Sequence, residues 1–74
     1  MTKKEALEHI KLETSKIYLE SRRATGQKKT KLATAYRLWQ SGLETAEGIY
    51  HEGGPDALER ILAIKLHLRI KTGR

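Results

Sequence analysis

The sequence contains no cysteine, valine or phenylalanine, and it has a single proline. Without cysteine there is no disulfide framework and no thiolate metal site, the usual supports of a small secreted domain. No apolar run approaches the length of a membrane span, and residues 1–10 carry charge where a signal peptide has an apolar core. We therefore expect a cytoplasmic protein that makes no membrane contact.

The absence of valine and phenylalanine also bears on the fold, because both residues favour β-strands. The large aliphatic residues are instead ten leucines and six isoleucines. Leucine, lysine, arginine and alanine are all good helix formers. A chain of 74 residues forms one small domain, residues 1–74, with a modest core. We predict an all-α fold and a partner that adds to its buried surface.

Apolar residues recur at helical spacing in three segments, which lie at about residues 3–24, 30–52 and 55–71. A capping box of Thr2 and Glu5 begins the first helix, and Thr25-Gly26 supplies its stop. The second and third helices are joined by a short link ending in Pro55, so they must pack antiparallel or at a sharp angle. We predict an antiparallel helical hairpin followed by a C-terminal helix.

The second segment contains Ser41 and Gly42, so a break into a helix-turn-helix is an alternative. Such a motif sets its two helices at a steep angle, and the phase of the apolar residues would then jump at the turn. The apolar stripe keeps its phase from Leu32 to Tyr50. We predict one continuous helix, in which Gly42 faces inward and permits the close approach of another backbone.

The stretch IKLHLRIK, residues 64–71, alternates apolar and basic residues. This pattern is typical of a strand, so the alternative fold is α+β, with a strand at 63–71 that pairs between chains. Helix is favoured because no breaker follows Pro55 and no other segment alternates. On a helix, the apolar residues form a core stripe and a second stripe of Leu62, Leu66 and Ile70. This second stripe predicts an interface, most simply in a homodimer.

The net charge of +6 is unevenly spread, with +4 in residues 25–42 and −4 in residues 43–60. Lysines crowd the predicted start of the second helix, where the helix dipole favours anions, so a bound phosphate would explain their placement. The candidate phosphate-binding residues near this helix start are Arg22, Arg23, Lys28, Lys29, Thr30 and Lys31. The third helix adds Arg60, Lys71 and Arg74 on one face.

Other sites find little support in the sequence. The tyrosines and Trp39 fall on apolar stripes, which predicts core packing; of these only Tyr36, beside Arg37, comes close to a stacking platform for nucleic acid. His9 shares a helix face with Glu5 and Glu13, but zinc requires three or four converging N or S ligands. There is no Cys nucleophile and no Ser in a triad motif. We expect no enzyme, no metal and no cofactor.

The leading hypothesis is a small basic regulatory protein that binds DNA or RNA through phosphate contacts as a homodimer. The alternative is a protein-binding regulator, an inhibitor or adaptor that docks on a larger enzyme such as the transcription machinery. That protein partner would contact the second apolar face of the third helix.

Overall fold

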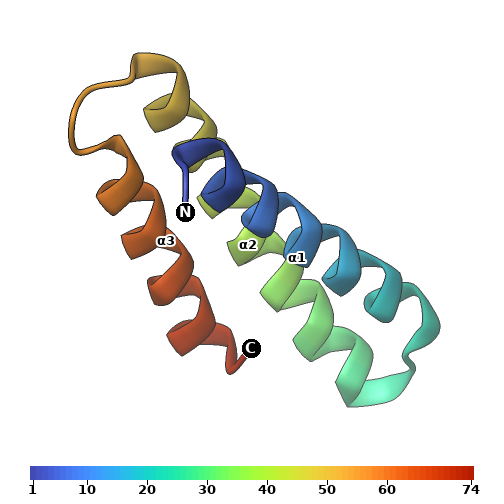
Figure 1. Cartoon of the computed structure of the whole chain (residues 1–74). Coiled ribbons are helices and arrows are strands. Elements are labelled where there is room, and N and C mark those ends of the chain that lie inside the picture. The colour runs from blue at the N-terminus through green and yellow to red at the C-terminus, as the bar shows by residue number, and fades with distance from the viewer.

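The computed structural model describes all 74 residues and contains three helices, which are α1 (Lys3–Arg23), α2 (Gly26–Glu52) and α3 (Ala57–Thr72). Helices α1 and α2 form a long antiparallel hairpin, and α3 packs along it (Figure 1). The predicted all-α fold of three helices is confirmed, and the alternative strand at 63–71 is wrong because this segment is helical. The three helices lack an apolar stretch long enough to cross a membrane.

The helix ends follow the local sequence. The Thr2 hydroxyl accepts a hydrogen bond from the Glu5 amide at 3.1 Å, and the Glu5 carboxylate accepts one from the Thr2 amide at 2.9 Å. Helix α2 begins at Gly26, four residues earlier than predicted, because this glycine takes a φ of +64° and redirects the chain directly into the next helix. The predicted basic loop is therefore helical from Gly26 onward.

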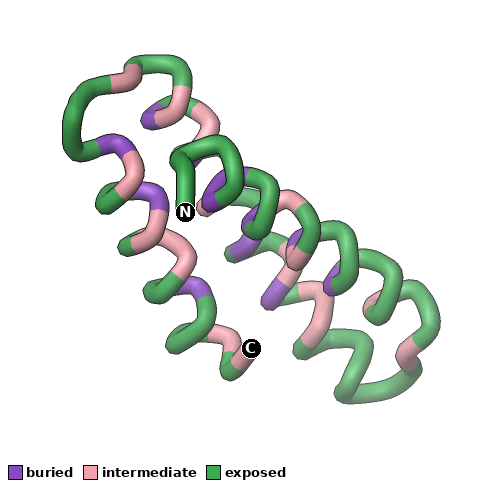
Figure 2. The backbone as a smooth tube through the Cα atoms, in the orientation of Figure 1, coloured by how far each residue is buried: buried purple, intermediate pink, exposed green.

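The core combines apolar residues from all three helices (Figure 2). Its eleven buried members are Ala6, Leu7, Ile10, Ile17, Ala35, Trp39, Ala46, Ile49, Ala57, Ile61 and Leu68. Trp39 is the largest fully buried side chain. These residues belong to the stripes expected from the helical spacing, so the phase of each helix is as predicted.

Helix α2 is unbroken at Ser41 and Gly42, as predicted. A Cβ atom on Gly42 would lie 2.6 Å from Leu68 Cδ1, so the glycine faces α3 and makes room for a leucine side chain. The expectation that another backbone approaches at this point is corrected: the space is filled by the side chain of Leu68.

The molecule is elongated, with extents of 44 × 18 × 18 Å. Helix α3 has 16 residues against 27 in α2, so it ends before reaching the turn between α1 and α2 (Figure 1). No residue between Ile17 and Ala35 is buried. We call residues 18–34, at the end of the hairpin that α3 covers only in part, the tip.

Candidate nucleic-acid interface

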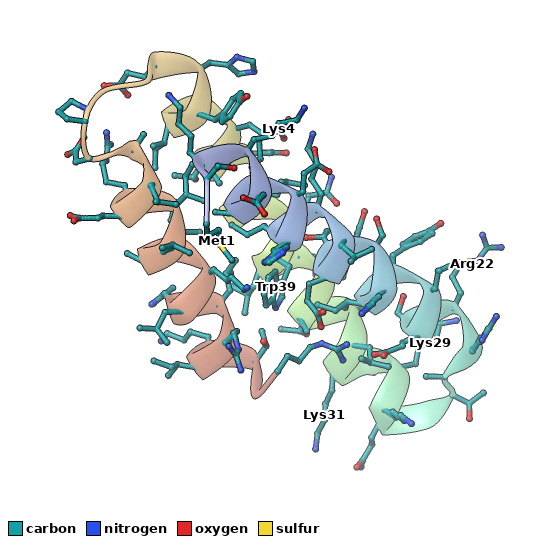
Figure 3. The ribbon with its side chains drawn as sticks, viewed as in Figure 1. Met1, Lys4, Arg22, Lys29, Lys31 and Trp39 are labelled. Atoms are coloured by element: carbon teal, nitrogen blue, oxygen red, sulfur yellow. The ribbon has the colours of Figure 1, made fainter.

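The tip carries five of the predicted phosphate-binding cations. Arg22 and Arg23 lie in the last turn of α1, and Lys28, Lys29 and Lys31 lie in the first two turns of α2. All five side chains are exposed, and none belongs to an ion pair. Arg22, Lys29 and Lys31 project from the same end of the hairpin (Figure 3).

The sequence between Glu20 and Glu44 has no carboxylate, although it holds six basic residues. The sixth is Arg37, an exposed residue of α2 that the sequence analysis did not include in the candidate site. Arg37 lies two turns after Lys29 on the same helix, and this spacing could have placed it among the candidate residues from the sequence alone. The tip therefore holds five basic residues against one carboxylate, Glu20, and that carboxylate is bonded to Arg74.

The start of α2 adds backbone donors to this charge. The first turn of α2 contains no acidic residue, and the N-cap residue Thr25 makes no side-chain capping hydrogen bond. The first N–H groups of a helix have no partner within the helix, and they form the positive end of its dipole. An anion at this end would therefore meet unpaired amides as well as Lys28 and Lys29.

Lys71 is the residue of α3 that joins the tip. Together with Thr30, Lys31 and Thr34 it lines a groove between the C-terminal end of α3 and the N-terminal part of α2. Arg60 lies near the other end of α3, where its Nη1 is 3.9 Å from Glu52 Oε2. The structure thus brings Lys71 to the predicted site and leaves Arg60 away from it.

Arg74 is engaged within the fold. Its Nε donates to Glu13 Oε1 at 2.8 Å, and its Nη1 and Nη2 donate to the two carboxylate oxygens of Glu20 at 2.6 and 3.2 Å. These bonds raise the pKa of Arg74 and, chiefly through the bond from Arg74, lower the pKa of Glu20. With its guanidinium occupied by two carboxylates, Arg74 ties the C-terminal end of α3 to α1.

Tyr36 and Tyr50 pack against the core as expected, and Trp39 is buried in it, but Tyr18 differs from the prediction. Tyr18 is 42% exposed, in a groove lined by residues of α1 and α2 alone. Its ring centroid lies 5.3 Å from that of Tyr36, and the Arg22 guanidinium carbon lies 5.8 Å from the Tyr18 centroid. The spacing of Tyr18 and Arg22, four residues apart on one helix, was the signal for this contact. An aromatic pair therefore borders the basic tip.

The predicted apolar interface is exposed in part. Leu66 and Ile70 are 58% and 73% exposed on the outer face of α3. Leu62 is half-buried and packs against the core. The outward apolar surface of α3 therefore consists of Leu66 and Ile70.

The polar residues elsewhere form no metal-binding group of three or more His, Cys, Asp or Glu side chains. His9 Nδ1 lies 3.3 Å from Lys65 Nζ, in a contact between α1 and α3. No known family model matches the sequence, and no curated protein or solved structure matches it significantly. Any functional assignment therefore depends on the geometry and charge of this chain.

Proposed function

We propose that this protein is a small, non-catalytic nucleic-acid-binding regulator that acts in the cytoplasm and contacts phosphates with its tip. One observation carries the proposal. The tip presents five basic side chains that have no carboxylate partner, next to the open N-terminus of α2. A polyanion would supply the missing negative charge.

The phosphate ligands in this proposal are Arg22, Arg23, Lys28, Lys29 and Lys31, with Lys71 and the Thr30 hydroxyl at the edge of the same surface. Arg60 and Arg74 are not included: Arg60 lies beside Glu52, away from the tip, and the Arg74 guanidinium is already bound by Glu13 and Glu20. Contacts of this kind bind DNA or RNA without reading its sequence. Each phosphate that is neutralised releases counterions, so affinity falls steeply as salt is added.

A binding titration with a fluorescent 20-base-pair DNA duplex tests the proposal, starting at about 50 mM salt and repeated at higher salt. The variant Lys28→Glu/Lys29→Glu should lose binding. The matched control is Lys3→Glu/Lys4→Glu, since Lys3 and Lys4 also occupy the first turn of a helix, α1, and are also exposed. Equal losses in both variants, or no binding by the wild type at low salt, would refute the tip as the binding site.

A protein-binding regulator is the second candidate. It is favoured by Leu66 and Ile70, two large apolar side chains one turn apart that project from α3 into solvent. Such a regulator would dock on a larger enzyme by burying these side chains. The variant Leu66→Glu should then abolish capture of the partner while leaving duplex binding unchanged. If Leu66→Glu alters neither, this second candidate is withdrawn.

A further inference from the structure

A second groove, distinct from the tip, runs between α2 and α3. Leu38, Ser41 and Thr45 of α2 line one side of it, and Ala63 and Ile64 of α3 line the other. Leu38 is 41% exposed although it is a large apolar side chain. Helix α1 contributes no residue to this groove, so it is an open apolar seam between two helices.

The two ends of this face of α2 and α3 carry charges of opposite sign. At one end Lys31 and Lys71 line a continuation of the same α2–α3 seam, and neither has a carboxylate partner. At the other end Glu52 lies beside Arg60 of α3, and the exposed Asp56 and Glu59, at the N-cap and in the first turn of α3, add negative charge. The face is therefore basic at one end, apolar in the middle and acidic at the other.

We infer that this face binds a second copy of the same chain, in an antiparallel homodimer whose two-fold axis passes between Ser41 and Gly42. A surface whose charge changes sign about its own midpoint is complementary to itself when the copy is turned end for end. The inference concerns self-association and does not depend on nucleic-acid binding.

The register follows from positions on α2. With the axis between Ser41 and Gly42, Lys31 of each copy lies level with Glu52 of the other. The same register sets Leu38 against Thr45 of the other copy, beside Ala63 and Ile64, where the groove is apolar. Arg37 comes within one turn of Glu44 of the other copy. Two charge pairs and one apolar contact thus share a single register, and each occurs twice.

The face runs along the long axis of the molecule, whose extents are 44 × 18 × 18 Å. It therefore offers an extended surface to a second copy. The exposed residues at the middle of α2, Ser41 and Thr45, are small and would allow the two helices to approach closely.

A charge exchange measured by sedimentation velocity tests the dimer, with nucleic acid removed beforehand. The wild type should sediment as a dimer of the 8.4 kDa chain. The variants Lys31→Glu and Glu52→Lys should each weaken self-association by about tenfold or more, and the double variant should restore it. Within one chain these residues are 21 positions apart, or about 31 Å along a helix, so restoration requires contact between copies.

Lys29→Glu is the matched control, because Lys29 is another exposed lysine in the first two turns of α2 and does not line either α2–α3 groove. It should leave the sedimentation of the dimer unchanged. A wild type that remains monomeric at about 100 µM, or a double variant that associates no better than the single ones, overturns the proposed dimer.

Cross-linking examines the position of the axis directly. The chain has no cysteine, so Ser41→Cys introduces a single thiol next to the proposed axis. A short bifunctional maleimide should link two such chains into a covalent dimer. The control Ser15→Cys places the thiol at an exposed position of α1. Ser15 lines the groove between α1 and α2, to which α3 contributes no residue. Equal yields from the two variants would contradict this register.

These tests separate the two proposals. Lys31 belongs to both proposals, so Glu52→Lys is the variant that separates them: it lies outside the tip and should weaken self-association while leaving duplex binding intact. A protein that dimerises as described but binds no duplex would refute only the nucleic-acid function.

Discussion

The indole Nε1–H of buried Trp39 donates a hydrogen bond to the hydroxyl oxygen of Thr72 at 3.0 Å, and this hydroxyl donates in turn to the Leu68 carbonyl at 2.7 Å. The largest side chain of the core therefore has its one polar atom satisfied by the last residue of α3. This pairing joins the middle of α2 to the C-terminal end of α3.

Thr72→Val should lower the free energy of unfolding by about 1 to 2 kcal/mol, because it leaves the buried indole donor without an acceptor. Chemical denaturation followed by Trp39 fluorescence measures the change. Thr34→Val is the control: the Thr34 hydroxyl is exposed and bonds only to the Thr30 carbonyl of its own helix. A loss of the same size in both variants would show that the indole bond contributes nothing.

The two glycines in the interior of α2, Gly42 and Gly48, should respond oppositely to substitution by alanine. Gly48→Ala should stabilise the protein by up to about 1 kcal/mol, since alanine favours helix and no atom lies within 4 Å of the added Cβ. Gly42→Ala should destabilise it by about 1 kcal/mol, since the clash with Leu68 outweighs the same gain in helix propensity. Thermal unfolding followed by circular dichroism gives both values. A stabilised Gly42→Ala variant would mean that Leu68 moves aside at little cost.

The contact between Arg74 and Glu20 should make stability depend on pH. The hydrogen bond from Arg74 lowers the pKa of Glu20 from its ordinary value of 4.5. A carboxylate whose pKa is lower in the folded state stabilises the fold above the unfolded pKa, and this contribution is lost as pH falls through the folded pKa.

Arg74→Gln should therefore reduce the free energy of unfolding at neutral pH by up to about 1 kcal/mol, since the Glu20 side of the pair is half-exposed. The difference from the wild type should shrink as pH falls below 4.5. Denaturation at a series of pH values measures it, and Glu20→Gln provides the complementary variant. A difference that stays constant down to acid pH would exclude an ionised Glu20 as the cause.

Single cations of the tip should change the salt dependence of duplex binding. Arg22→Gln removes one proposed phosphate contact and should reduce the slope of log affinity against log salt by about 0.9. Arg60→Gln should leave the slope unchanged, because Arg60 lies beside Glu52 and away from the tip. Fluorescence anisotropy at several salt concentrations gives both slopes. Equal slopes for the two variants would mean that Arg22 touches no phosphate.

Neighbouring leucines of α3 should differ strongly in their contribution to stability. Leu68 is buried against Gly42, so Leu68→Ala should cost about 2 to 4 kcal/mol. Leu66 is exposed, so Leu66→Ala should change stability by less than about 0.5 kcal/mol when measured at low protein concentration. Chemical denaturation measures both. Comparable losses would contradict the helical orientation of the alternating stretch.

The helices and the core were predictable because periodicity and capping are local properties of a sequence. Thr2 and Glu5 begin α1 as expected, and the phase of the apolar residues of α2 correctly argued against a break at Gly42. Gly26 was interpreted only as a stop for α1. In the structure α1 ends at Arg23 through the extended Ala24 and Thr25, so Gly26 opens α2 and does not cap α1.

The predictions for Arg74 and Tyr18 were wrong because tertiary packing determines what surrounds these two side chains. Arg74 follows the left-handed Gly73, so a helical projection extended past Thr72 gave its side chain the wrong direction. Tyr18 was expected in the core, but its groove is lined by α1 and α2 alone and has no third helix to cover it. The concentration of positive charge at the tip was predictable, because the charged residues of a segment can be counted without knowing the fold.

Because α3 is short, the residues that set the charge of the tip are largely different from the residues that form the core. No buried residue lies between Ile17 and Ala35, so substitutions in the tip alter charge without disturbing the core. The eleven buried core residues lie outside this stretch, within which Glu20 bonds to Arg74 and the partly buried Leu32 packs against the core. Evolution can therefore vary what the tip attracts, one lysine or arginine at a time, while selection for folding acts on a different set of positions.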